Sequence, residues 1–324
     1  MSYCGTRAIL SYARRRNLID VPNHRSSHTV PTPRGGGVGV MLGLFVLWAL
    51  SWLLGLFDWT LALALLPSFV IAIIGWVDDQ CGLSARLRLV LQLSLATLTF
   101  FLLGRAETSV WSLWFLPLAV LACAWLTNLY NFMDGIDGLS GTQLATVGLM
   151  IAVLSTARGD YAGVVVGLGA IGAAVGFLFF NWTPARIFMG DVGSAASGYW
   201  LAAWALHTVL RGEFSPSVWL VVHAAFIGDA TWTLVVRISH GQRPAEAHRL
   251  HLYQKLTQMG WSHARVALSY GCFNLFLLLP LAALHAAGFF GWPWAMGLAY
   301  LPVLVACYLI RAGVPENPSA LSAR

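Results

Sequence analysis

Ten long apolar runs fill most of this sequence. They lie at about 38–57, 61–77, 89–104, 110–127, 139–157, 161–180, 193–210, 216–236, 264–286 and 292–311. Each is close to the ~20 residues that a helix needs to cross ~30 Å of hydrocarbon, although the second and third runs are short. Because the runs are continuous rather than alternating, they favour helices over the strands of a membrane barrel. The sequence therefore predicts an all-α, polytopic membrane helical bundle of about ten transmembrane helices, forming a single integral membrane domain over residues 1–324.

The balance of charged and apolar residues supports a membrane protein. Charged residues make up only 10% of the 324 residues, and hydrophobic residues make up 58%. A soluble domain carries roughly a quarter charged residues. The Lys and Arg residues behind the net charge of +6 fall mostly in loops on one side of the predicted membrane. This pattern favours contact with membrane lipid and argues against nucleic acid as a partner.

Lys and Arg residues also give the predicted orientation. Alternate loops lie on one side of the bundle, at about 11–37, 78–88, 128–138, 181–192 and 237–263. Thirteen Lys and Arg residues fall in these loops or at their edges, whereas only Arg105, Arg158 and Arg211 lie between runs on the other side. Basic residues are enriched in loops that face the cytosol. We therefore expect these five loops, and an active-site cleft lined by their polar residues, to face the cytosol.

The segment 128–141, NLYNFMDGIDGLSG, is the densest polar cluster between two apolar runs. A polar side chain recurs every three residues, at Asn128, Asn131, Asp134 and Asp137. Successive members drift by ~60° around a helix, so Asn128 and Asp137 would lie on opposite faces of one straight helix. A single site for all four needs a helix end or break, which we expect near Gly135. The alternative is an ordinary polar turn between two helices.

Three further carboxylates lie at the ends of apolar runs. Asp78 and Asp79 close the second run, and adjacent helical residues point ~100° apart. We therefore expect one at a reacting centre and the other orienting a metal, a water or a partner. The alternative is a solvated helix end paired with Arg86 or Arg88. Asp191, flanked by glycines before the seventh run, suits a metal ligand or, equally, a helix cap.

The last cytosolic loop contains His248, Arg249 and His251. Two histidines could bind a transition metal, but no cysteine accompanies them, so we interpret the loop as a contact for phosphate or sugar. The alternative is a solvated basic loop near anionic lipid. Asp229 lies inside the eighth run. An ionisable residue there is a functional candidate, although a structural pairing with a neighbouring helix is equally consistent with the sequence.

The cost of burying these acids predicts a hydrated cleft. Six carboxylates would cost ~3 kcal/mol each at mid-bilayer, on the order of 18 kcal/mol together. They are Asp78, Asp79, Asp134, Asp137, Asp191 and Asp229. Since clustered carboxylates repel one another, they call for a cation. Oxygen ligands favour Mg²⁺, with Mn²⁺ as the second candidate, and such an ion can clamp phosphates.

Four polar segments occur here in one order and together carry a resemblance. They are Asp78-Asp79, NxxNxxDGxDGL from Asn128, GDxGS from Gly190, and the histidine-containing last loop. In this combination the chain resembles the polyprenyl-phosphate N-acetylhexosamine-1-phosphate transferases, glycosyltransferase family 4. That family includes the phospho-MurNAc-pentapeptide translocase and the enzymes that begin lipid-linked glycans. The segments 22–37 and 248–254 resemble the glycan-initiating branch.

The resemblance implies a reaction and its partners. Undecaprenyl phosphate would attack a UDP-N-acetylhexosamine, giving a polyprenyl-diphosphate sugar and UMP. This is the first membrane step of O-antigen or other cell-envelope glycan synthesis. The enzyme would be a multi-pass protein of the bacterial inner membrane, dependent on Mg²⁺, and a homodimer is consistent with the resemblance. The sequence leaves the sugar open among GlcNAc, FucNAc and QuiNAc.

The resemblance also implies roles for individual residues. Catalytic roles fall to four carboxylates: Asp78, Asp79, Asp134 and Asp137. The first pair would act at the reacting phosphates, where one could serve as a base, and the second pair would help hold nucleotide and metal. Substrate binding falls to six residues: Asn128, Asn131, Arg34, His248, Arg249 and His251. Asp191 would be a Mg²⁺ ligand, joined by Asp78 or Asn131.

One feature departs from the family, and two other functions remain to be weighed. Family members normally carry a spanning helix before the first cytosolic loop, where this chain shows only a stub at Met1–Leu10. Either the reading frame begins further upstream, or this version lacks that helix. A transporter or an intramembrane aspartyl protease would also need membrane carboxylates. A transporter predicts polar residues near mid-helix in several runs and an inverted internal repeat, and the protease needs two opposed Asp residues deep in the bilayer. The sequence places only Asp229 at such a depth and shows no repeat.

Overall fold

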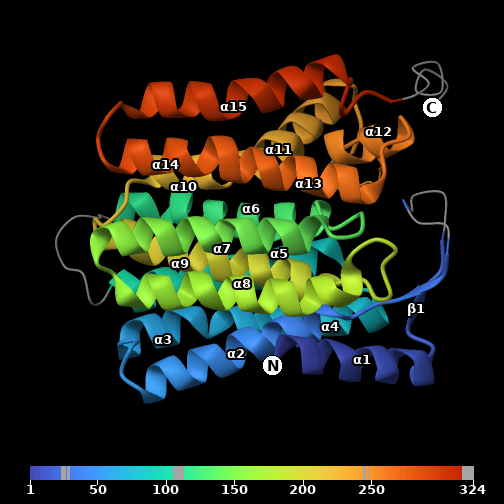
Figure 1. Cartoon of the computed structure of the whole chain (residues 1–324), viewed down its shortest axis with the longest axis horizontal. Coiled ribbons are helices and arrows are strands. Elements are labelled where there is room, and N and C mark those ends of the chain that lie inside the picture. Colours follow the sequence, from blue (N-terminus) through green and yellow to red (C-terminus); the bar gives the residue numbers. More distant parts are fainter. Residues whose placement is uncertain (23–26, 28–29, 105–112, 244–245, 247, 316–324) are drawn as a thin grey trace.

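The predicted helical membrane architecture is confirmed in the computed structural model, where every apolar run forms helix (Figure 1). The structure describes residues 1–22, 27, 30–104, 113–243, 246 and 248–315. The helices are α1 (Ser2–Arg16), α2 (Gly37–Leu53), α3 (Trp59–Leu65), α4 (Pro67–Cys81), α5 (Ala85–Gly104), α6 (Leu116–Phe132), α7 (Leu139–Arg158), α8 (Tyr161–Asn181), α9 (Asp191–Leu210), α10 (Pro216–Val222), α11 (Ala224–Ser239), α12 (Leu252–Gln258), α13 (His263–Phe273), α14 (Leu279–Ala286) and α15 (Trp292–Leu309). A 3₁₀ turn η1 (Leu113–Phe115) precedes α6, and a π-helical segment η2 (Asn274–Leu278) joins α13 to α14.

Length and apolar composition identify most of the membrane spans. Among the described residues, six helices are long and apolar enough to cross a bilayer, and one of them is α3 continued by α4 as Trp59–Cys81. A seventh span is formed if α10 and α11, which are bent by 82° at a short break, count as one. Helices α2 and α6 are apolar as well, with 17 residues each. The polytopic bundle therefore rests on helices that match the expected runs.

The N-terminal stretch forms a helix that is longer than the expected stub. Helix α1 continues past Leu10 to Arg16, and Asn17 ends it in the left-handed conformation with φ 53°. It packs against α2 and α8. A Cβ added at Gly39 of α2 would overlap Thr6 of α1, so glycine allows the two helices to approach closely.

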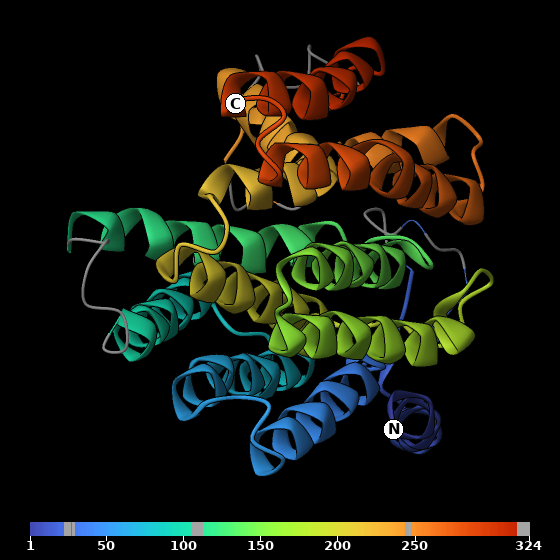
Figure 2. The same ribbon diagram turned by 60° about the vertical axis from the view of Figure 1, so that its left-hand side comes forward.

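The helices lie in layers around α9. Figure 1 shows α15 at one edge, then α13 and α14, then the central helices α6 to α9, and α1 to α4 at the other edge, and Figure 2 shows the same layers from another side. Helix α9 is buried along almost its whole length, because glycine, alanine and serine dominate its first half. A Cβ at Gly198 would lie 2.7 Å from the Leu126 carbonyl oxygen of α6. Small residues therefore bring α9 against its neighbours, as is common between membrane helices.

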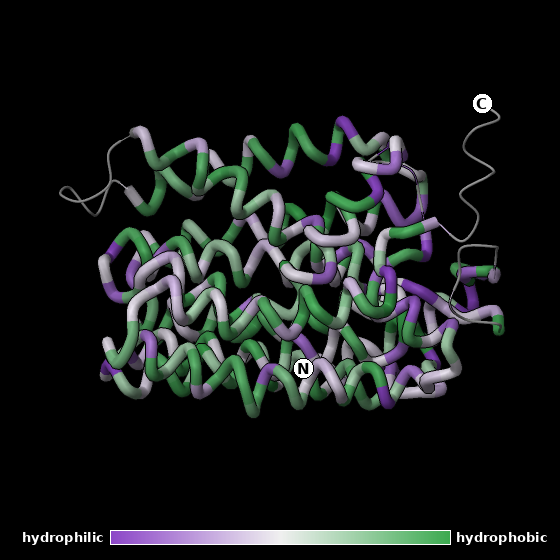
Figure 3. The backbone as a smooth tube through the Cα atoms, turned by 90° about the horizontal axis from the view of Figure 1, so that it is seen from above, coloured by the Kyte–Doolittle hydropathy of each residue, from purple (hydrophilic) through white to green (hydrophobic). Residues whose placement is uncertain are grey.

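Polar segments gather at one end of the bundle. In Figure 3 the middle of the molecule is mostly hydrophobic, and hydrophilic segments concentrate at the end that carries the last described residues. Successive spans alternate in direction, so the connections after α1, α4, α6, α8 and α11 meet at this end. Here Ile19–Asp20 (β1) pairs antiparallel with Thr32–Pro33 (β2). The fold thus brings the polar loops predicted from the sequence together.

Candidate active site

Asp78 and Asp79 occupy the last turn of α4 and point in different directions, as their helical spacing predicts. The Asp79 carboxylate accepts hydrogen bonds from the backbone N–H groups of Asp191 and Val192, each at 3.2 Å. Asp78 instead accepts a hydrogen bond from the N–H of Leu83 at 2.5 Å and turns its other oxygen toward a pocket. Asp79 therefore caps the N-terminus of α9, while Asp78 faces the small pocket beside it.

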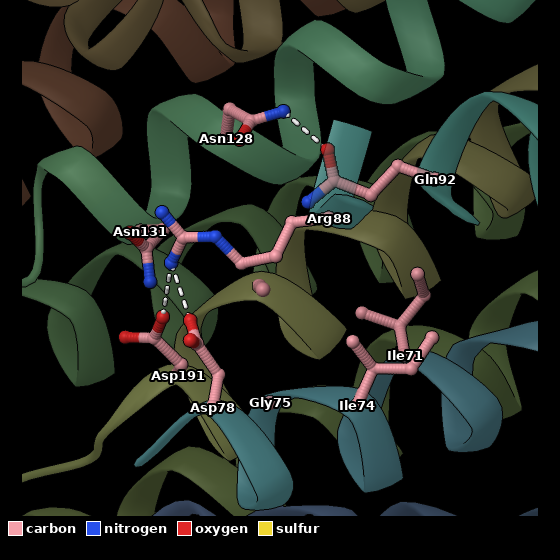
Figure 4. A pocket seen from close by; sticks show the side chains of 10 residues that line it. Ile71, Ile74, Gly75, Asp78, Arg88, Gln92, Asn128, Asn131 and Asp191 are labelled. Carbon is pink, nitrogen blue, oxygen red and sulfur yellow. Dashed lines mark hydrogen bonds and ion pairs between the residues drawn. The ribbon is translucent and has the colours of Figure 1, made fainter. Parts of the chain in front are cut away.

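Arg88 of α5 lies between the carboxylates of Asp78 and Asp191 (Figure 4). Its Nη1 donates a hydrogen bond to Asp78 and lies 3.0 Å from Oδ2 of Asp191. Because one nitrogen contacts both side chains, the two carboxylates converge on a single point. The surrounding pocket leaves about 20 Å³ of free space, and its lining also includes Gln92, Asn128 and Asn131. This volume is enough for one water-sized particle.

The two asparagines of α6 complete the polar wall of this pocket. Asn131 donates a hydrogen bond to the hydroxyl of Ser194 on α9 at 3.2 Å. One turn earlier, Asn128 donates to Oε1 of Gln92 at 2.5 Å and to the carbonyl of Ala124 at 2.7 Å. The structure thus brings Asn128 and Asn131 together with Asp78 and Asp191, from three different helices.

This donor set suits a hard divalent cation. Asp78 and Asp191 offer carboxylate oxygens around a point that already holds a positive charge in the structure, and Asn131 lines the same pocket with its amide nitrogen turned to Ser194. No group of three His, Cys, Asp or Glu side chains in the described part of the chain is arranged to hold a metal. Mg²⁺ in enzymes commonly takes one or two carboxylates and completes its shell with water and substrate phosphates. The residues present therefore fit Mg²⁺ or Mn²⁺ held jointly by protein and substrate.

The helix break expected near Gly135 is present. Helix α6 ends at Phe132 and α7 begins at Leu139, after Gly138 with φ 76°. A Cβ at Gly135 would overlap the hydroxyl of Tyr253, so glycine is required at this contact. The break turns the chain between the two halves of the NxxNxxDGxD segment, and it separates Asn128 and Asn131 from the two aspartates.

Asp134 and Asp137 lie in different surroundings within this turn. Burial raises the pKa of Asp134 well above its ordinary value, and the negative charges of Asp191 and Asp79 act in the same direction. Burial would also raise the pKa of Asp137, but hydrogen bonds and the nearby His263 ring hold it below the ordinary value. Asp134 thus lies close enough to Asp191 and Asp79 to feel their charges, but neither Asp134 nor Asp137 lines the pocket itself.

Asp137 serves instead as a junction between loops. Its carboxylate lies 3.3 Å from Nδ1 of His263 and accepts a hydrogen bond from the N–H of Ala185 at 3.1 Å. Next to it, Asn181 accepts a hydrogen bond from the N–H of Gly138 at 2.9 Å and donates to the carbonyl of Ile187 at 2.9 Å. These bonds tie the 133–138 turn to the loop between α8 and α9.

The glycine-rich segment before α2 docks on the loop before α9. The N–H groups of Gly36 and Gly37 donate to the carbonyls of Phe188 and Met189, both at 2.8 Å. A Cβ at Gly37 would overlap Gly193. This close contact holds Arg34 beside Asp79: the guanidinium donates to the Asp79 carbonyl, and Nη1 lies 3.9 Å from Oδ1. Part of the segment 22–37 that carries the resemblance, residues 23–26, 28 and 29, lies outside the described residues.

The last loop presents its two histidines as a close pair. The rings of His248 and His251 lie 4.8 Å apart. Burial lowers the pKa of His248 to about 3, and His251 and Arg237 act in the same direction, so this ring is neutral at pH 7. His251 is buried and its Nδ1 lies 3.4 Å from Asp229. Arg249 accepts a hydrogen bond from Gln258 on its carbonyl at 3.0 Å. The structure therefore turns His251 inward toward Asp229, and the predicted role of His251 in substrate binding stays a prediction.

Five residues of this region were not among the predicted site residues. They are Arg88, Gln92, Asn181, Tyr253 and His263. The sequence suggests Arg88 only as a partner for the end of the second apolar run, because its contact with Asp191 spans 103 positions of sequence. Gln92 offered a signal, because it is a polar side chain one turn beyond Arg88 inside an apolar run.

Comparisons with known proteins point to one family. The model of glycosyl transferase family 4 matches residues 61–209, the segment that contains Asp78, Asn131 and Asp191. A probable undecaprenyl-phosphate N-acetylglucosaminyl 1-phosphate transferase of Bacillus subtilis is 31% identical over 261 residues, covering 76% of this chain and 71% of the relative.

Two further relatives cover most of the chain. The decaprenyl-phosphate N-acetylglucosaminephosphotransferase of Mycobacterium tuberculosis is 30% identical over 313 residues, which is 83% of this chain and 76% of the relative. The phospho-N-acetylmuramoyl-pentapeptide-transferase of Halalkalibacterium halodurans is 27% identical over 279 residues, which is 78% of this chain and 83% of the relative. The family expected from the ordered motifs is confirmed: the chain belongs to glycosyl transferase family 4, the membrane enzymes that transfer a sugar 1-phosphate to a polyprenyl phosphate.

Proposed function

We propose that this enzyme transfers an N-acetylhexosamine 1-phosphate from a UDP-sugar to undecaprenyl phosphate. One observation carries the proposal: Asp78 and Asp191, from different helices, converge on one cationic nitrogen at the polar end of a membrane bundle. Phosphoryl transfer depends mainly on positioning and on neutralising charge, and such a site can supply both. Family membership favours this function over the transporter and the intramembrane aspartyl protease.

In the proposed reaction, a phosphate oxygen of the acceptor attacks the β-phosphorus of the UDP-sugar. The bond from that phosphorus to the bridging oxygen breaks, UMP leaves with the oxygen, and the sugar stays on the β-phosphate. A bound Mg²⁺ or Mn²⁺ would neutralise charge on the diphosphate. Asp78, Asp191 and Asn131 would hold the ion, and Asp79 would keep the N-terminus of α9 in register with them. Arg88 would then be able to contact a phosphate.

The acceptor's isoprenoid chain has an apolar cavity available. A cavity of about 230 Å³ lies between α6, α9, α10 and α11, and its lining extends from Phe115 of η1 along α6 to Leu129. Leu129 follows Asn128 of the polar pocket directly in sequence. We place part of the acceptor's chain in this cavity, because it would then lead the phosphate end toward the carboxylates.

The names of the relatives support a choice of the first donor sugar to test. Two of them are named for N-acetylglucosamine, so UDP-GlcNAc is the first donor to test, ahead of UDP-FucNAc and UDP-QuiNAc. The product would start O-antigen or another cell-envelope glycan. The hydrophilic segments share one end of the bundle, and most Lys and Arg residues of the sequence fall in the loops at that end, which supports an active site that faces the cytosol of the bacterial inner membrane.

The experiment that tests this function gives purified protein a panel of UDP-sugars with undecaprenyl phosphate and Mg²⁺. UMP release is measured, and the lipid product is weighed by mass spectrometry. We expect UMP only when both the lipid and a divalent cation are present, with a product mass equal to acceptor plus sugar 1-phosphate. Absence of UMP with every UDP-N-acetyl sugar would contradict the proposal.

A further inference from the structure

Asp229 is a fully buried carboxylate inside a membrane helix, and it lies outside the pocket of Asp78 and Asp191. It is on α11, with none of its surface exposed. A charge in such a position is costly unless hydrogen bonds satisfy its oxygens. Its partners therefore indicate what the residue does.

Most of those partners belong to the last cytosolic loop and α12. The N–H of Leu252 donates to Oδ1 at 2.8 Å, and the N–H of Tyr253 donates to Oδ2 at 3.2 Å. Nδ1 of His251 lies 3.4 Å from Oδ1. The hydroxyls of Thr233 on α11 and Tyr270 on α13 also donate to the carboxylate, at 3.2 Å to Oδ1 and 2.7 Å to Oδ2. One carboxylate thus fixes the start of α12 and the histidine that precedes it.

A second buried charge on α11 holds the other end of the same loop. Arg237 is 1% exposed, and its guanidinium donates to the carbonyls of Arg243 and Glu246, both at 2.9 Å. It also donates to Oε1 of Gln242 at 2.8 Å. Two buried charges two turns apart on one helix therefore bind the loop on either side of His248 and Arg249.

Tyr253 extends this link to the turn that carries Asp134 and Asp137. Its hydroxyl donates to the carbonyl of Phe132 at 3.0 Å and fills the space beside Gly135. The ring itself is fully buried. A shift of α12 would therefore move the Tyr253 hydroxyl and change the position of the turn between α6 and α7.

We infer that Asp229 is a positioning residue for the transfer reaction: through the start of α12 it sets the place of His251, and through Tyr253 it sets the Asp134–Asp137 turn. It touches no substrate itself. The inference rests on the proposed function, because it assigns Asp229 a part in that reaction. An alternative in which Asp229 only stabilises the bundle predicts no specific link to the loop or to turnover.

The first test is hydrogen–deuterium exchange on the intact protein in detergent. In Asp229→Asn, one acceptor oxygen and the charge are lost, so amides of residues 250–258 should exchange at least ~10-fold faster while α7 and α8 keep wild-type protection. Thr233→Val is the matched control, because its hydroxyl also bonds Asp229 at 3.2 Å but has no link to the loop. Unchanged exchange over 250–258 in Asp229→Asn would overturn the inference.

The second test is steady-state UMP release. Asp229→Asn should lower kcat on the order of 10- to 100-fold, as loss of a residue behind a site typically does, with KM for the UDP-sugar within about 3-fold. Thr233→Val should keep wild-type kcat. A rise in KM with unchanged kcat, or wild-type values for both, would contradict the inference.

A second variant, Tyr253→Phe, tests the inference if the Asp229→Asn protein does not fold. It removes only the hydroxyl bond to Phe132, so kcat should fall and exchange should rise at 133–138, while 250–258 stays protected. Wild-type exchange at 133–138 would overturn the link. The exchange measurements need no substrate, so they test the inference even if wild-type protein turns over no UDP-sugar, which would count against the proposed function instead.

Discussion

Asp79 and Asp191 meet through the backbone: the Asp79 carboxylate accepts a hydrogen bond from the Asp191 N–H at 3.2 Å, and a second from Val192 at 3.2 Å. The side chain of Asp191 is thereby left free of Asp79 and faces Arg88 and Asp78. Asp78 and Asp79, which are adjacent in sequence, therefore have different roles: Asp79 holds the start of α9, and Asp78 faces the pocket.

This division predicts different phenotypes for the two conservative variants. Asp78→Asn should weaken Mn²⁺ binding at least ~10-fold and change thermal stability little, since it removes a charged ligand. Asp79→Asn should lower stability by about 1–3 kcal/mol, because two backbone N–H groups lose a charged acceptor, and should affect Mn²⁺ binding less. Mn²⁺ titration followed by electron paramagnetic resonance and thermal unfolding in detergent measure the two effects. Equal losses of Mn²⁺ affinity in both variants would refute the assignment of Asp78 to the cation and Asp79 to the end of α9.

Arg88 competes with a cation for the same two carboxylates. Two unit charges 4 Å apart interact by about 1 kcal/mol even at the dielectric constant of water, so Arg88→Gln should bind Mn²⁺ about 5-fold or more tightly. Its kcat should fall, because a phosphate contact is lost. Arg86→Gln is the matched control, because it removes the same charge from an exposed position two residues away. Weaker Mn²⁺ binding in Arg88→Gln would show that the guanidinium does not occupy the cation position.

The Asp137–His263 contact predicts a dependence of stability on pH. Burial alone would raise the pKa of Asp137 in the folded protein. His263 and hydrogen bonds outweigh burial, so this pKa lies below its ordinary value. The ionised form therefore stabilises the fold above the unfolded pKa of about 4, and this contribution is lost as pH falls through the lower folded value. His263→Gln should have a lower melting temperature than wild type at pH 6, by the equivalent of about 1–2 kcal/mol. The gap should close toward pH 3, and a gap that stays constant from pH 6 to pH 3 would count against this account.

Gly135 and Tyr253 should show coupled effects. Gly135→Ala places a methyl group where the Tyr253 hydroxyl lies, so we expect lower stability and at least ~10-fold lower activity. In the double variant Gly135→Ala with Tyr253→Phe, removal of the hydroxyl relieves the overlap, so stability should partly recover. Melting temperatures of the two single variants and the double variant form the cycle. Additive losses would mean that the overlap is not the cause.

The helices and the polar residue types of the site could be predicted from the sequence. The contacts between helices that are far apart in the chain could be predicted much less well. Apolar runs determine helices locally, and the drift of Asn128 to Asp137 around a helix required the break that is observed at Met133–Gly138. The ordered motifs gave the family. Each of these conclusions depends on residues that are close together in the chain.

Contacts between distant segments could not be predicted in the same way. The bridge from Arg88 to Asp191 and the inward turn of His251 toward Asp229 depend on how helices pack. Asp137 was expected with the other carboxylates, but the turn after α6 directs it to His263 and Ala185. The direction in which such a side chain points changes if the helix ends one residue earlier or later. The sequence does not predict the last residue of a helix with that precision.

UMP release by the purified protein tests the central claim most directly. Wild-type protein is given UDP-GlcNAc, with and without undecaprenyl phosphate and with and without Mg²⁺, beside Asp191→Asn. We predict UMP only from wild type with both additions, and at least ~100-fold less from Asp191→Asn. UMP formation that needs no lipid acceptor, or wild-type turnover by Asp191→Asn, would contradict a sugar-1-phosphate transfer centred on Asp78 and Asp191.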